Sequence, residues 1–172
     1  MPDEILIQTA TNRADLAAWA AVKKQVDPLD RVTVEELEHD LDVDPATRLL
    51  LASIDGDVVA SAIGKSSKAM PDTMFAMVRV LPAQRRRGTG SALFDAITAL
   101  ARERGLGFLF GRIDETDVPS LDWAARRGLT EIARESTLLL TWVRRAARLH
   151  HRARTGSAMT SGPTRCPTRE VA

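Results

Sequence analysis

A run of basic residues and glycines near the middle of the chain carries the clearest chemical signal in the sequence: Arg85-Arg86-Arg87-Gly88-Thr89-Gly90-Ser91. An apolar segment, 74–80, precedes this run, and apolar residues at helical spacing follow it over 93–101. The two glycines therefore lie between a predicted strand and the N-terminus of a predicted helix. Unpaired N–H groups and the helix dipole favour an anion there, and glycine lets the backbone approach it closely. The pattern is typical of a pyrophosphate-binding turn.

The flanks of this turn extend the pattern to V-x-P-x-x-R-x-x-G-x-G, filled by Val80, Pro82, Arg85, Gly88 and Gly90. This spacing resembles the acyl-CoA signature of the GNAT superfamily of N-acetyltransferases. A second apolar segment, 108–113, follows the predicted helix. Two strands joined by such a crossover are most naturally parallel, with a right-handed connection. The alternative is a solvated basic turn in another α/β domain. A nucleotide P-loop is excluded, because G-x-x-x-x-G-K-[ST] does not occur, and the chain also lacks G-x-G-x-x-G.

The remaining patterns predict the element order β-α-α-β-β-β-α-β-α-β-β over residues 3–143. A capping box at Thr33 and Glu36 predicts the start of the second helix, and Asp55-Gly56 predicts a hairpin between strands 48–54 and 58–63. This order matches the GNAT fold along the body of the chain. The resemblance, which is to the first half of tandem acetyltransferases, implies an α/β (α+β) class. The expected mixed central sheet has about seven strands, flanked by about four helices.

Composition divides the chain into an acidic body and a basic tail. From Arg144 onward the sequence holds seven arginines and one acidic residue, with Gly, Ser, Pro and Thr prominent. We therefore expect an acetyltransferase domain over 1–143 and a basic, disordered tail over 144–172. The sequence shows neither a signal peptide nor an apolar run of about 18 residues, and Cys166 is its single cysteine. A cytoplasmic location without membrane association is expected.

The resemblance also implies how acetyl-CoA is held. Backbone groups near Val78 and Val80, at the end of the 74–80 strand, pair with the pantetheine arm as an added strand would. The N–H of Val80 lies near the thioester oxygen. Backbone amides of the turn hold the pyrophosphate. Arginine side chains there either add charge-assisted contacts or remain solvated. The predicted cofactor-binding residues are Val78, Val80, Arg85, Arg86, Arg87, Gly88, Thr89, Gly90, Ser91 and Asp117.

One part of the family pattern is missing. Many members carry N-x-x-A-x-x-x-Y-x-x-x-G-F, in which the tyrosine protonates the departing thiolate. Counting back from Gly128 places Asp117 at the asparagine, Ser120 at the alanine and Ala124 at the tyrosine, and the chain contains no tyrosine. We expect Ser120 or water to serve on the thiolate side.

The general base is less well defined by the sequence. Asp114 and Glu115 both follow the 108–113 segment, at the end of the sheet where α/β proteins bind ligands, and Glu115 is preferred. Asp114 and Asp72 are alternatives, and each of these carboxylates could instead be a solvated loop residue. No grouping of His, Cys and Asp has metal-ligand spacing, so no metal is expected.

The sequence thus predicts an N-acetyltransferase that moves an acetyl group from acetyl-CoA to a primary amine by direct attack in a ternary complex. The amine could be a small molecule, a peptide N-terminus or a lysine side chain. Six carboxylates within 35–44 either attract a cationic acceptor or form a solvated helix face. The alternatives are a catalytically silent acyl-CoA-binding module and a nucleic-acid-associated protein. No nucleic-acid partner is expected, and the chain is expected to be a monomer or homodimer.

Overall fold

A mixed sheet of seven strands in the order β1-β2-β3-β4-β5-β7-β6 forms the centre of the computed structural model, which describes residues 4–67, 70–135 and 139–145. All neighbouring strands are antiparallel except β4 and β5, which are parallel. The predicted fold class is confirmed. The strands are β1 (Ile5–Thr9), β2 (Arg48–Ile54), β3 (Asp57–Ser66), β4 (Thr73–Val80), β5 (Phe108–Asp114), β6 (Thr130–Glu135) and β7 (Leu139–Arg145).

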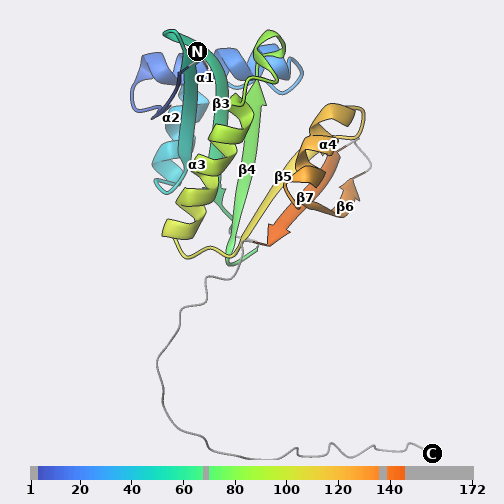
Figure 1. Ribbon diagram of the computed structural model, residues 1–172. Helices are drawn as coiled ribbons and strands as arrows, with labels where there is room; N and C mark the ends of the chain where they lie inside the picture. Colours follow the sequence, from blue (N-terminus) through green and yellow to red (C-terminus); the bar gives the residue numbers. More distant parts are fainter. Residues whose placement is uncertain (1–3, 68–69, 136–138, 146–172) are drawn as a thin grey trace, which may run out of the picture.

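Helices cover both faces of the sheet (Figure 1). α3 (Thr89–Glu103) lies on one face, and α1 (Arg13–Val26) and α2 (Val34–Val43) lie on the other. α4 (Val118–Arg126) packs on the α3 side, where its Ala124 joins the same apolar cluster as Leu93 and Ile97 of α3. A second cluster, built around Trp19 and Leu37, joins α1 and α2 to the sheet. Full burial of each large side chain contributes about 1.5–3 kcal/mol.

Local signals in the sequence set the boundaries of two helices. Thr33 Oγ1 accepts from the N–H of Glu36 at 3.2 Å, and Glu36 Oε2 accepts from the N–H of Thr33 at 2.7 Å. The predicted capping box is thus confirmed. Asn12 caps α1 through a bond from the N–H of Asp15 at 2.9 Å.

The C-terminal part of the fold differs from the expectation by a few residues. β7 extends to Arg145, beyond residue 143, where the sequence placed the end of the domain. Residues 136–138 and 146–172 fall outside the described residues, so the predicted disorder of the tail stays a prediction.

Candidate active site

β4 and β5 separate part of the way along their length. They pair over only three positions, from Thr73↔Phe108 to Phe75↔Phe110. β4 continues to Val80 paired on its other edge with β3, and β5 continues to Asp114 paired with β7. Among the described strands, none covers the β5-facing edge of β4 beyond Phe75 (Figure 1). The structure confirms the predicted parallel pair and adds this point of separation, which we call the fork.

Gly111 marks the fork itself. A Cβ atom added to Gly111 would lie 2.4 Å from the carbonyl oxygen of Ala76, closer than any side chain tolerates. Only glycine lets the two backbones meet here and then diverge.

A continuous cleft begins at the fork and ends at the arginine–glycine turn. One part, of about 340 Å³, lies between the diverging strands, and the other, of about 370 Å³, lies over the turn. The two parts share the lining residues Val26, Val78, Arg79, Arg85, Asp117, Ser120 and Trp123. The cleft is therefore long enough to take an extended ligand along the uncovered edge of β4.

The turn presents backbone N–H groups to this cleft. Gly88 is the N-cap of α3 with φ +88°, and among the described residues no side chain caps the helix. Arg86, just before it, also has a positive φ, of +67°, a conformation that a non-glycine residue adopts at a cost. The first amides of α3, Thr89, Gly90 and Ser91, have no carbonyl four residues back within the helix. The local geometry is that of an anion site.

Nine of the ten predicted cofactor residues line the cleft. Arg87 is the exception, since its guanidinium instead donates to Gln84 Oε1 at 2.5 Å. Thr89 as a whole is only 1% exposed. Arg85 donates from Nε to the carbonyl of Val80 at 3.2 Å, which places its side chain over the end of β4.

α4 supplies the wall opposite β4. Asp117 caps this helix: its carboxylate accepts from the Ser120 N–H at 3.2 Å and from the Ser120 hydroxyl at 2.7 Å. Trp123 Nε1 donates to Ser91 Oγ at 3.4 Å and so links α4 to the first turn of α3. Ala124, at the position where the family pattern has tyrosine, is fully buried in the core. Trp123, one residue earlier, does line the cleft and was missed by the sequence reasoning.

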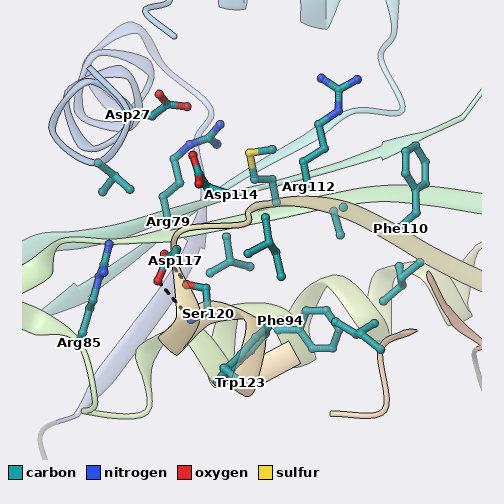
Figure 2. Close-up of a pocket in the computed structure, with 18 residues that line it drawn as sticks. Asp27, Arg79, Arg85, Phe94, Phe110, Arg112, Asp114, Asp117, Ser120 and Trp123 are labelled. Carbon is teal, nitrogen blue, oxygen red and sulfur yellow. Dashed lines mark hydrogen bonds between the residues drawn. The ribbon is translucent and has the colours of Figure 1, made fainter. Parts of the chain in front are cut away.

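The other wall, on the α1 side of the sheet, is charged. Arg79 of β4, Arg112 and Asp114 of β5, and Asp27 at the end of α1 all line the cleft there (Figure 2). The sequence reasoning missed Asp27 and both arginines. Side chains alternate across a strand, so the signal for Arg79 was present in its position between Val78 and Val80, whose side chains face α3.

The three carboxylates considered as the general base differ in their position relative to the cleft. Glu115 follows the end of β5 and is not among the residues that line the cleft; its predicted catalytic role stays a prediction. Asp114 lines the cleft, but hydrogen bonds from the hydroxyl and the N–H of Thr116, at 2.7 and 2.8 Å, lower its pKa. A lowered pKa makes a carboxylate a weaker base. Asp72 lies at the opposite end of β4, where it accepts from the N–H of Gly107 at 2.8 Å.

A site of this shape, between two diverging parallel strands of an α/β fold and next to a helix N-terminus, suits an extended anionic ligand. Residues 13–129 match the model of the acetyltransferase (GNAT) family, and the chain belongs to this family. It is therefore an acyltransferase, and its family uses acetyl-CoA. No curated protein sequence matches the chain significantly.

Solved structures share this fold at low sequence identity. A candidate acetyltransferase of Salmonella typhimurium, yncA, solved with its cofactor acetyl-CoA, superposes with a TM-score of 0.71 at 17% identity, covering 85% of this chain and 96% of that one. The ribosomal-protein-S18-alanine N-acetyltransferase of Escherichia coli superposes with a TM-score of 0.70 at 13% identity, covering 88% of this chain and 100% of that one. A candidate phosphinothricin N-acetyltransferase superposes with a TM-score of 0.69 at 22% identity, covering 84% of this chain and 100% of that one.

Within 4–67, 70–135 and 139–145, no helix is long and apolar enough to cross a membrane. The same part of the chain contains no cluster of three or more His, Cys, Asp or Glu side chains that could hold a metal ion.

Proposed function

We propose that this protein transfers the acetyl group of acetyl-CoA to a primary amine by direct attack within a ternary complex. The observation that carries the proposal is the fork, which leaves one edge of β4 uncovered from Met77 to Val80 and continuous with the turn at Gly88. Unpaired backbone groups on a strand edge bind an extended ligand as an added strand would. The pantetheine arm of acetyl-CoA is such a ligand, and its pyrophosphate suits the N-terminus of α3.

The two walls of the cleft have different roles: residues on the α3 side bind acetyl-CoA, and residues on the α1 side receive the amine. On the α3 side, Val78 and Val80 present backbone groups to the pantetheine, and the amides of Gly88, Gly90 and Ser91 bind the pyrophosphate. On the α1 side, the amine approaches the thioester past Asp27 and Arg79. The nitrogen forms a bond to the acetyl carbon, the carbon–sulfur bond breaks, and coenzyme A leaves as a thiolate.

Removal of a proton from the amine is the more demanding of the two proton transfers. Removal of the proton from a lysine-like ammonium group of pKa near 10.4 costs about 4.6 kcal/mol at pH 7. A thiol of pKa near 8.5 that leaves as the thiolate loses only about 2 kcal/mol of driving force. Asp27 is better placed than Glu115 to accept this proton, because it is half-buried and lines the cleft. Water can protonate the thiolate afterwards.

Ser120→Ala is expected to lower turnover by no more than about threefold. The Ser120 hydroxyl already donates a hydrogen bond to Asp117 Oδ2, so its proton is directed away from a departing thiolate. The measurement is the steady-state rate of coenzyme A release at saturating substrates. A loss of a hundredfold or more would instead assign Ser120 the role of the missing tyrosine.

Two measurements test the proposed function. Titration with acetyl-CoA should raise the melting temperature and change the fluorescence of Trp123, which lines both parts of the cleft. Release of coenzyme A over a panel of amines should then show transfer. Binding without release from any amine would favour the silent module, for which the buried Ala124 at the tyrosine position is the specific argument. Absence of binding at millimolar acetyl-CoA would overturn both functions.

A further inference from the structure

The charged wall of the cleft carries two arginines and two carboxylates. Figure 2 shows Arg79 and Arg112 extending from the two diverging strands to one side of the sheet, the side on which Asp27 and Asp114 also lie. The opposite wall, with Phe94 and Trp123, is largely apolar (Figure 2). A neutral or purely cationic acceptor would bring no counter-charge to Arg79.

Arg79 is the most unusual member of this wall. Its side chain is only 6% exposed, and it packs with its guanidinium carbon 5.7 Å from the centre of the Trp19 ring. Burial lowers the pKa of Arg79, although Asp30 and Asp27 act in the opposite direction. Arginine nevertheless keeps its proton in proteins, so the positive charge remains inside the wall.

The protein satisfies this buried charge incompletely. Nη2 lies 4.0 Å from Asp30 Oδ2, which is too long for a hydrogen bond, and Asp30 is held more closely by Lys23, whose Nζ lies 2.7 Å from Oδ1. Nη1 is buried and donates to no partner among the described residues. A buried charged donor without a partner is costly, and a bound anion would remove that cost.

The position of Arg79 selects where that anion would lie. Arg79 follows Val78 and precedes Val80, the two residues proposed to face the pantetheine and the thioester. An anionic group bound by Arg79 therefore holds the rest of its molecule beside the reacting carbonyl. For an amine to reach that carbonyl from such an anchor, the two groups must be close together in the acceptor.

We propose that the acceptor is a free α-amino acid and that Arg79 binds its carboxylate. The inference rests on the proposed transferase function and adds the class of substrate. A guanidinium binds a carboxylate through two parallel hydrogen bonds, which fixes orientation as well as position. The ammonium group is then directed toward Asp27, loses its proton to that carboxylate or to water, and the neutral nitrogen attacks the thioester.

The first experiment compares acceptors on the wild-type chain. The probes are the common free amino acids, the carboxamide of each, and the amine that lacks the carboxyl group altogether. The release of coenzyme A is expected to give, for the preferred amino acid, a kcat/KM at least about 30-fold above that of its carboxamide. Equal or faster reaction with the carboxamides or simple amines would overturn the proposal while leaving the transferase function intact. Binding of acetyl-CoA without transfer to any of the three classes would overturn both.

The second experiment separates recognition by Arg79 from a purely structural role. Arg79→Gln is expected to raise KM for the amino acid at least about tenfold, with a small change in kcat, and to reduce the preference over the carboxamide to within about threefold. Arg79→Lys keeps the charge but loses the forked geometry of the guanidinium, so it should also reduce the preference for the amino acid over its carboxamide. It provides the test if Arg79→Gln does not fold.

Asp30→Asn is the matched control. It removes the carboxylate nearest Arg79, yet Asp30 does not line the cleft. The control should keep the wild-type preference for the carboxylate. If Asp30→Asn and Arg79→Gln lower the rates with both acceptors alike, Arg79 is a structural residue and the proposal is wrong.

Discussion

Acetyl-CoA is expected to bind the Gly88→Val variant at least about 30-fold more weakly than the wild-type chain. Gly88 has φ +88°, in the left-handed region, where a β-branched residue is strongly disfavoured. The turn must therefore change its backbone conformation, and the amides at the start of α3 lose their common direction. Each hydrogen bond to a charged group is worth about 1.5–3 kcal/mol, and about 2 kcal/mol corresponds to a 30-fold change in the dissociation constant.

Gly105→Val provides a control with matched backbone strain. Gly105 also has a positive φ, of +69°, and it lies just beyond the other end of α3, outside the cleft. Neither glycine has a close neighbour that a Cβ atom would strike, the nearest atom being Ile5 Cδ1, 3.9 Å from the Cβ position at Gly88. Both variants should lose stability, but only Gly88→Val should lose affinity in a calorimetric titration with acetyl-CoA. Equal affinities in the two variants would show that the turn does not hold the pyrophosphate.

The features that the sequence predicted well are those encoded over a few residues. The capping box at Thr33, the hairpin at Asp55-Gly56 and the strand–turn–helix passage around Gly88 each depend on neighbours in the chain. Eight of the nine predicted cofactor residues that line the cleft belong to the passage around Gly88 or to the strand that leads into it, and the ninth, Asp117, was placed by the spacing of the family pattern.

The features that the sequence missed depend on packing between distant segments. Asp27 reaches the cleft only because α1 packs on the sheet beside β4. Whether a carboxylate after β5 reaches the cleft depends on where the strand ends. Residues 109–114 of β5 all line the cleft, whereas Glu115, the first residue beyond the strand, does not. The sequence pattern does not fix a strand end to one residue.

Arg79 illustrates a different limit. Its place within an apolar strand was visible in the sequence, but its burial, its distance from Asp30 and its partnerless Nη1 arise only when β4 and α1 pack together. The acceptor could not be predicted for the same reason. Structural relatives of this chain are named for different acceptors, including ribosomal-protein alanine and phosphinothricin, so the shared fold does not determine what the charged wall binds.

Gly111→Ala is expected to lower the free energy of unfolding by about 3 kcal/mol, a large effect for the addition of one methyl group. The new Cβ atom would lie 2.4 Å from the carbonyl oxygen of Ala76, and both groups belong to the backbone of paired strands, so neither can turn away. Overpacking of this kind typically costs 1–3 kcal/mol, and relief requires β5 to move away from β4 at the fork. Chemical denaturation monitored by circular dichroism measures the loss.

Gly64→Ala on β3 is the appropriate comparison, because its Cβ atom would meet only side chains: Met74 Sδ at 3.2 Å and Leu100 Cδ2 at 3.4 Å. These flexible ends can shift, so the expected loss for Gly64→Ala is about 1 kcal/mol. Movement of β5 in Gly111→Ala should also widen the cleft and weaken acetyl-CoA, whereas Gly64→Ala should bind it normally. If Gly111→Ala unfolds at the wild-type denaturant concentration, the two backbones do not meet at this position and the fork lies elsewhere along β4.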